Sequence, residues 1–260
     1  MISGSSLPRS GALLVSVKCA DEAAAALAGG ANIIDAKDPI SGALGVVKPD
    51  VFTEICATVR GRVPVTAALG DAENAERAAQ LAAEYAGRGA RVVKVGFAGV
   101  ADPRRVEAIL AATVHACASG DTETGVVAVA YADAMRVDSI DPRSLVDAAA
   151  RSGVMGVLVD TADKDGPGLT AMWTPEELAM WIAAVRDNGL VAAVAGRLAA
   201  RDLMITRDAG ADIIGVRGAA CVGGRMGCVS VDRVRELRAQ LDTGSATRRF
   251  TSYVDSASHV

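Results

Sequence analysis

The feature that most constrains the fold of this chain is an eightfold alternation of short apolar runs with helical segments. The apolar runs are continuous and do not alternate with polar residues, which is typical of parallel strands buried on both faces. Glycine often separates a helix from the next run, as in "GRGARVV", where it can end the helix before a short turn. We predict strands at 12–17, 31–37, 62–69, 91–97, 125–131, 156–161, 190–196 and 212–218, and helices at 20–29, 49–60, 72–88, 103–118, 142–152, 175–188, 198–208 and 231–241.

Eight such units within 260 residues favour a closed (β/α)₈ barrel, or TIM barrel, over an open doubly wound sheet, which usually has fewer strands. We therefore predict an α/β protein with a single catalytic domain at residues 12–241. A flexible polar leader at 1–11 and a polar tail at 242–260 lie outside this domain. Neither segment carries residues that indicate chemistry.

Composition narrows the possible partners. The formal net charge of −4 is spread along the chain without a basic run, which argues against nucleic acid or an anionic membrane and favours a small molecule. No apolar run approaches the ~20 residues that span a bilayer, and the start lacks a signal-peptide pattern, so we expect a cytoplasmic protein. The five cysteines form no CxxC pair and there are two histidines, so we expect no metal site and no histidine triad. The alanine-rich helices suit self-association, so we expect a homo-oligomer, although no motif fixes its form.

Charged residues gather at the predicted carboxyl ends of the strands, where barrels of this type carry their chemistry. The second strand ends with Asp35 and Lys37, the fourth carries Lys94, and the sixth ends at Asp160 with Lys164 just beyond. Asp35 and Lys37 are two residues apart, so they share one face of their strand. An amine in an apolar pocket, or near another amine, loses its proton readily and can attack a carbonyl carbon.

This pattern predicts Schiff-base chemistry. Lys37 is the favoured nucleophile on position, Lys94 can be either the nucleophile or the base, and a carboxylate such as Asp35 or Asp160 can carry protons. A structural interpretation competes with this one, because Asp35 and Lys37 could be an ion pair that closes the barrel. Charges that point inward are costly unless they are paired or used, so five of them at one mouth favour a functional site.

The last two strands end in glycine and arginine. Gly196 and Arg197 follow the seventh strand, and Arg217 and Gly218 follow the eighth. Barrels often bind phosphate between these two loops through backbone N–H groups and a helix N-terminus. The sequence therefore predicts a phosphorylated substrate that is bound by these four residues.

Several segments, "GGANIIDAKDPISGALG", "VVKVGF", "VLVDTADKDG", "VAGRL" and "DIIGVRGAACVGGRMG", together resemble the (5-formylfuran-3-yl)methyl phosphate synthase family, also called 4-(hydroxymethyl)-2-furancarboxaldehyde-phosphate synthase. The resemblance runs from residue 12 to about residue 240. It implies a (β/α)₈ lyase, without a metal or organic cofactor, that condenses two glyceraldehyde 3-phosphate molecules into a furan aldehyde phosphate for methanofuran-type one-carbon carriers. It also implies roles for the five charged residues: Lys37 as the Schiff-base lysine, Lys94 as the proton acceptor, and Asp35, Asp160 and Lys164 as supporting catalytic groups.

Such a reaction requires two phosphate sites. The loop at residues 41–45, "SGALG", is a candidate for the second, because its glycines leave backbone N–H groups free. The family more often has a serine after the glycine of "VAGR", where this chain has Arg197. Two alternatives stay open: a class I aldolase that acts on phosphorylated trioses, and a non-catalytic barrel that senses phosphate.

Overall fold

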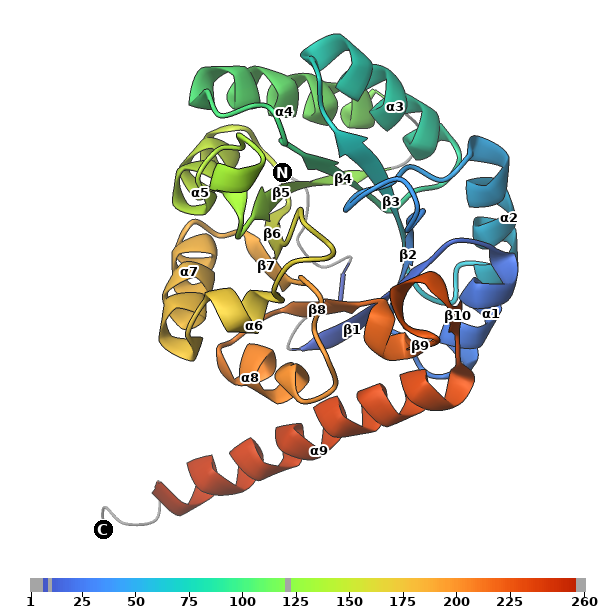
Figure 1. Ribbon diagram of the computed structural model, residues 1–260, viewed down its shortest axis with the longest axis vertical. Helices are drawn as coiled ribbons and strands as arrows, with labels where there is room; N and C mark the ends of the chain where they lie inside the picture. The colour runs from blue at the N-terminus through green and yellow to red at the C-terminus, as the bar shows by residue number, and fades with distance from the viewer. Residues whose placement is uncertain (1–6, 9–10, 120–122, 256–260) are drawn as a thin grey trace.

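The computed structural model describes residues 7–8, 11–119 and 123–255 of the chain. Eight parallel strands close into a barrel in chain order, with β8 paired to β1 (Figure 1). This closure confirms the predicted (β/α)₈ fold. The strands are β1 (Ala12–Val17), β2 (Ile33–Ala36), β3 (Val65–Asp71), β4 (Val92–Gly96), β5 (Gly125–Tyr131), β6 (Gly156–Asp160), β7 (Val191–Val194) and β8 (Ile213–Val216).

Helices form a ring outside the barrel (Figure 1). Several begin where the sequence places a proline after a capping residue: Asp102 and Asp141 accept backbone N–H groups at the starts of two helices, and Thr174 forms a capping box with Glu177. The helices are α1 (Ala20–Ala28), α2 (Pro49–Val59), α3 (Ala75–Gly87), α4 (Pro103–Ala118), α5 (Pro142–Arg151), α6 (Leu169–Met172), α7 (Pro175–Asp187), α8 (Asp202–Asp208) and α9 (Val231–Asp255).

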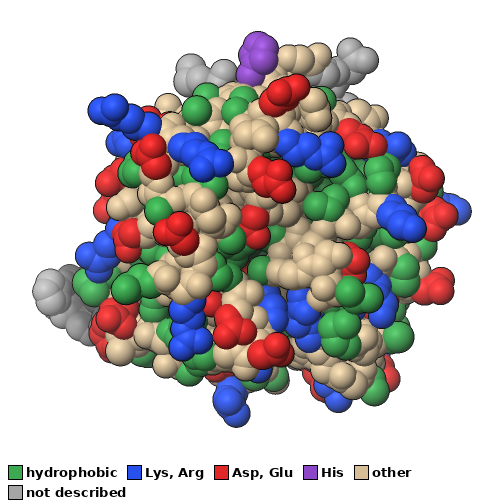
Figure 2. Space-filling model, turned by 45° about the horizontal axis from the view of Figure 1, so that its top comes forward, with side chains coloured by type: hydrophobic (Ala, Val, Ile, Leu, Met, Phe, Trp, Pro, Cys, Tyr) green, Lys and Arg blue, Asp and Glu red, His purple; other side chains and the backbone are tan. Residues whose placement is uncertain are grey.

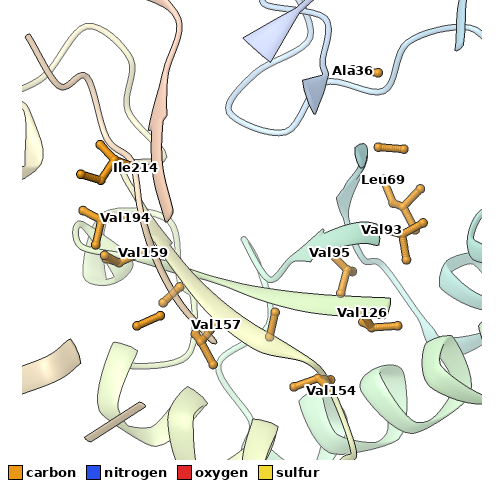
Figure 3. Close-up of a cluster of buried hydrophobic side chains, with 14 of the residues drawn as sticks. Ala36, Leu69, Val93, Val95, Val126, Val154, Val157, Val159, Val194 and Ile214 are labelled. Atoms are coloured by element: carbon orange, nitrogen blue, oxygen red, sulfur yellow. The ribbon is translucent and has the colours of Figure 1, made fainter. Parts of the chain in front are cut away.

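The apolar core lies mainly between the strands and the helices. Figure 3 shows part of it, where Val157 and Val159 of β6 lie near Val194 of β7 and Ile214 of β8. Successive side chains of a strand face opposite sides, so the alternate residues point into the barrel. The second apolar cluster, on that inner face, includes Leu14, Ile33, Val92, Val127, Leu158 and Ile213.

Both ends of the chain differ from the prediction in part. Leu7, within the predicted leader, is buried in the inner apolar cluster. The last helix continues to Asp255, well past the predicted end at residue 241, and projects beyond the barrel (Figure 1). Its first turns are anchored on the barrel, and each further residue of an existing helix adds a backbone hydrogen bond.

The connection from β8 to α9 has more structure than the sequence predicts. It contains a small antiparallel hairpin of β9 (Cys221–Val222) and β10 (Cys228–Val229), flanked by the short 3₁₀ turns η2 (Gly218–Ala220) and η3 (Gly224–Met226). A further 3₁₀ turn, η1 (Ala134–Arg136), follows β5. Of these short elements, η2 and η3 contribute Gly218, Ala219 and Arg225 to the site described below.

Among the described residues, no helix combines the length and the apolar character needed to cross a bilayer. On the face in Figure 2, acidic and basic side chains are interspersed.

Candidate active site

The candidate site lies at the carboxyl ends of the strands, inside the barrel. Asp35 of β2, Lys94 of β4 and Asp160 of β6 are inward-facing and buried, and Lys37 follows the end of β2. Lys164 lies on the loop after β6. The structure thus brings all five predicted charged residues to one cavity, which they line together.

Asp35 and Lys94 form the deeper of two ion pairs. Lys94 Nζ lies 2.6 Å from Asp35 Oδ1, and both side chains are almost fully buried. Thr66 Oγ1 donates to the same oxygen at 2.7 Å, and Ser16 Oγ donates to Asp35 Oδ2 at 2.9 Å. Four adjacent strands, β1 to β4, therefore contribute to a single carboxylate.

The electrostatics of this pair follow from its burial. Burial alone raises the pKa of Asp35, but Lys94 and Lys37 overcome this effect and hold the pKa below its usual value. Burial lowers the pKa of Lys94 below its usual value, and Lys37 lowers it further, against the opposing effect of Asp35. Lys94 therefore gives up its proton more readily than a lysine in water.

Asp160 lies between two other lysines. Its Oδ1 accepts hydrogen bonds from Lys164 Nζ at 2.6 Å and from the Thr161 backbone N–H at 2.7 Å. Its Oδ2 lies 3.8 Å from Lys37 Nζ and, among the described residues, has no hydrogen-bond partner although it is buried. Burial raises the pKa of Asp160, but Lys164 and Lys37 hold it below its usual value. An unpartnered buried carboxylate oxygen beside an amine can accept a proton, or a hydrogen bond from a substrate hydroxyl.

The loop that carries Lys164 is fixed by two carboxylates. Asp133, just after β5, accepts the backbone N–H groups of Ala162 and Asp163 at 2.7 and 2.8 Å. Asp163 in turn accepts the N–H groups of the next turn of the loop. Burial lowers the pKa of Lys164 below its usual value, and Lys37 acts in the same direction against Asp160. Lys164 is therefore a second amine that loses its proton readily.

The cavity has a volume of about 500 Å³. Its charged lining consists of Asp35, Lys37, Lys94, Asp160 and Lys164, whereas β7, its following residue and β8 contribute the small residues Ala193, Ala195 and Gly215. A Cβ at Gly215 would lie only 3.3 Å from the Cβ of Ala195. The small residues therefore leave space open within the cavity.

The predicted phosphate residues Gly196, Arg197, Arg217 and Gly218 line the same cavity. The first two have left-handed backbone, with φ of 107° at Gly196 and 56° at Arg197. This conformation is costly for an arginine and is found mostly where the surrounding structure imposes it, often at functional sites. Arg197 also donates to the carbonyl of Gly166, so it joins the loops after β6 and β7.

The geometry of Arg217 does not favour the phosphate role that the sequence predicts for it. Its Nε donates to the Arg225 carbonyl at 2.8 Å, Nη1 donates to the Ser16 carbonyl and to Glu22, and Nη2 donates to Glu22 and to the Gly227 carbonyl. All five N–H groups of the guanidinium thus have acceptors within the chain, and the buried Glu22 balances its charge. Arg217 holds the loop after β8 in place.

The loop at 41–45 also differs from its predicted role. Of the described residues that line the cavity, none lies between 38 and 45. The Asp38 carboxylate accepts the Ile40 N–H and the Ser41 hydroxyl, so a negative charge already occupies the start of this loop.

Sequence reasoning missed Ser16, Thr66 and Arg225. The two hydroxyls could have been found as the inward polar positions of "LLVSV" and "PVTAA". The position of Arg225 depends on the path of the hairpin after β8, which no sequence pattern indicates. No cluster of three His, Cys, Asp or Glu side chains suited to a metal ion occurs in the described part of the chain.

The fold and the site define a TIM barrel with buried lysine–aspartate pairs at the mouth of its cavity. Two solved structures are similar in fold: 3-hexulose-6-phosphate synthase, with TM-score 0.58, 20% identity and coverage of 88% of this chain and 98% of that one, and KGPDC from Streptococcus mutans, with TM-score 0.61, 13% identity and coverage of 91% and 98%. At these identities the likeness extends to the fold alone.

The chain belongs to the 4-HFC-P synthase family, which it matches over residues 13–238. It is 39% identical over 232 residues to (5-formylfuran-3-yl)methyl phosphate synthase of Methanopyrus kandleri, covering 88% of this chain and 98% of the relative. The enzyme of the same name from Methanothermobacter thermautotrophicus is 37% identical over 234 residues, covering 89% and 99%. A relative from Streptomyces griseus, named as a putative member, is 38% identical over 214 residues, covering 81% and 86%.

Proposed function

We propose that this chain is a lyase that condenses two molecules of glyceraldehyde 3-phosphate into (5-formylfuran-3-yl)methyl phosphate through a Schiff base on Lys37. The names of its relatives support the product, and its place is in the synthesis of methanofuran-type one-carbon carriers. Two trioses give one furan phosphate, one inorganic phosphate and two waters, so the reaction needs neither an oxidant nor a reductant. The observation that carries the mechanism is Lys37 Nζ at 3.8 Å from the unpartnered Oδ2 of Asp160.

Imine formation uses this pair. The neutral Lys37 amine adds to the carbonyl carbon of one triose, and the carbinolamine then loses its oxygen as water, which requires a proton. Asp160 Oδ2 is placed to accept a proton from the nitrogen and to return one to the leaving hydroxyl. Lys164, hydrogen-bonded to the other oxygen of Asp160, is the nearest source from which that carboxylate can be reprotonated.

Carbon–carbon bond formation uses the deeper pair. The triose on Lys37 must be in its ketone form, so that loss of a proton from carbon gives an enamine. Neutral Lys94 accepts that proton, and its lowered pKa makes the neutral form accessible. The enamine adds to the aldehyde of the second triose, and ring closure with loss of phosphate and water completes the furan.

Incubation of the purified protein with glyceraldehyde 3-phosphate alone tests this proposal, with ultraviolet absorbance for the furan and an assay for released phosphate. We expect Lys37→Arg to abolish both signals, because a guanidinium keeps the charge but forms no imine. The exposed Lys48, outside the cavity, gives the matched control, and Lys48→Arg should retain wild-type rates. Borohydride added during turnover should attach the triose to Lys37.

The other results separate the alternatives. Substantial furan formation by Lys37→Arg would exclude this lysine as the nucleophile. A reversible acyclic aldol without phosphate release would indicate a class I aldolase. Binding of phosphate without any trapped adduct would indicate a non-catalytic barrel.

A further inference from the structure

Arg225 joins two loops at the mouth of the barrel. It lies in η3 after β8, is half-buried and lines the cavity. Its Nη1 donates to the Pro39 carbonyl, and its Nη2 donates to the Gly42 carbonyl at 2.7 Å, so it reaches the loop that follows Lys37. The guanidinium therefore sits between the loops after β2 and β8.

Arg225 differs in its pairing from four more deeply buried cations of the cavity. Lys37, Lys94, Lys164 and Arg217 each have a carboxylate oxygen within 4.0 Å. Arg225 has no such partner among the described residues, where its acceptors are neutral carbonyls and, at 3.9 Å, the Met226 sulfur. A cation removed from water without a counter-charge is costly, so this position favours an anion.

Arg225 also has donors to spare. A guanidinium has five N–H groups, and within the described structure no acceptor meets the Nε–H or the second Nη2–H of Arg225. Nε and Nη2 form the edge of an arginine that binds two phosphate oxygens at once. Burial and the neighbouring Arg217 lower the pKa of Arg225, against the opposing effect of Asp160, Asp165 and Asp38, none of which forms an ion pair with it.

The main chain of Arg225 is held by Arg217. Arg217 Nε donates to the Arg225 carbonyl, and the buried Glu22 fixes Arg217 in turn. Gly218 lies against the same segment, since a Cβ there would be 3.6 Å from the Arg225 nitrogen. Glu22 and Arg217 thus support Arg225, and Arg217 itself has no donor left for a ligand.

We propose that Arg225 binds a phosphate group of the substrate at this edge of the cavity. The inference rests on the proposed function for its substrate, a phosphorylated triose. It replaces the phosphate contact predicted for Arg217 and for the loop at 41–45. Lys164, which lines the same cavity, interacts electrostatically with Arg225.

Binding of glycerol 3-phosphate, an unreactive analogue, tests this site by calorimetry without any turnover. We expect Arg225→Gln to weaken binding by about 10- to 100-fold, as for loss of a bidentate charge-assisted contact. Arg225→Lys keeps the positive charge but cannot bind two phosphate oxygens at once, so its affinity for glycerol 3-phosphate should lie between those of Arg225→Gln and the wild type. The lysine variant also provides the test if the glutamine variant does not fold. Arg201→Gln is the control, because that side chain is 88% exposed and lies outside the cavity.

A second measurement separates phosphate binding from loop support. Unphosphorylated glyceraldehyde should be trapped on Lys37 by borohydride at the wild-type rate in Arg225→Gln, because no phosphate is involved. An equal loss of trapping and of glycerol 3-phosphate binding would reduce Arg225 to a support for the loop and overturn the proposal. The proposal would also be overturned if Arg225→Gln bound glycerol 3-phosphate with wild-type affinity, or if the wild type did not bind it.

These outcomes are independent of the furan assay. A wild-type protein that makes no furan but binds glycerol 3-phosphate through Arg225 would refute the proposed reaction and support the anion site. Furan formation at the wild-type rate by Arg225→Gln would support the proposed reaction and refute the anion site.

Discussion

At the scale of single residues, the site depends on lysines whose charged form is destabilised by burial. Lys94 is almost fully buried, and Asp35, with its two hydroxyl donors, offsets only part of the cost of its ammonium. Asp35 in turn remains ionised because its neighbours are positive. The ion pair thus offsets part of the cost of burying Lys94 and leaves it an amine whose neutral form is accessible.

The pH dependence of the rate tests this arrangement. The pKa of Lys94 lies below its usual 10.5, so its neutral fraction grows as pH rises through a value under 10.5. We expect kcat/KM for furan formation to rise with pH along this limb. Lys94→Ala should lower the rate by orders of magnitude and remove the limb, while circular dichroism shows an intact fold. A near-normal rate in that variant would exclude Lys94 as the proton acceptor.

The lowered pKa of Lys94 also makes the stability of the fold rise with pH, as it does the rate. Between the folded pKa of Lys94 and 10.5 the unfolded chain binds more protons than the folded one, so this residue makes the protein more stable as pH rises through that window. Asp35 acts at acidic pH. Its contribution to the stability is fully present above pH 3.8, its ordinary pKa, and is lost as the pH falls through its lower pKa in the folded protein.

The sequence allowed prediction of the five charged residues because strand ends and two-residue spacing fix where such side chains point. It did not allow prediction of their pairing, in which Lys94 meets Asp35 and Lys37 meets Asp160. Arg217 shows the reason, because its partner Glu22 is 195 positions away. Only the closed barrel brings α1 next to the end of β8.

At the scale of elements, the loop after β8 is ordered by one buried ion pair. Glu22 of α1 and Arg217 at the end of β8 are both buried, and their atoms approach to 2.9 Å. Arg217 also holds the hairpin, because it donates to the carbonyls of Arg225 and Gly227 in the turn between β9 and β10. The support is electrostatic, so removing one charge leaves the other uncompensated.

Glu22→Gln should therefore be strongly destabilising. We expect a loss of about 3–5 kcal/mol in the free energy of unfolding, because a buried arginine is left without its counter-charge. Glu107→Gln is the matched control: its partner Arg151 is 59% exposed, and exposed pairs contribute about 0–1 kcal/mol. Urea denaturation measures both, and similar small losses would show that Arg217 is not supported in this way.

The barrel strands and the helices that cover them were predicted, whereas several short elements outside the barrel were not. The strand predicted at 125–131 matches β5, and the helix predicted at 103–118 matches α4. The two-residue strands of the hairpin and the four-residue α6 have no periodicity to detect, because their backbone is set by contacts with the barrel. The functional loop is therefore the part that the sequence leaves least determined.

At the scale of the whole molecule, the cavity at the mouth of the barrel continues into its interior. The cavity extends from Arg225 and Lys164 at the mouth to Leu14, Ile33 and Leu7 among the inner apolar residues. Leu7 comes from the segment before β1, which was predicted to be a leader without a role. Its side chain adds apolar surface to the wall of the cavity.

Leu7→Ala should lower the free energy of unfolding by about 2 kcal/mol, near the lower end for buried leucines, because the site already borders an open space. Met135→Ala gives the control, since Met135 is 99% exposed and its loss should be within about 0.5 kcal/mol. Thermal unfolding followed by calorimetry compares the two. An unchanged midpoint for Leu7→Ala would show that this segment does not dock in solution.

The closure of β8 on β1 has a consequence for the chain before it finishes folding. The charged groups come from early and middle strands, Asp35 and Lys37 with β2, Lys94 with β4 and Asp160 with β6. The small residues of the last two strands and Arg225 complete the cavity that these groups line, and they reach it only when β8 pairs with β1. The reactive groups and the space for their substrate are therefore completed in the same step, the closure of the barrel.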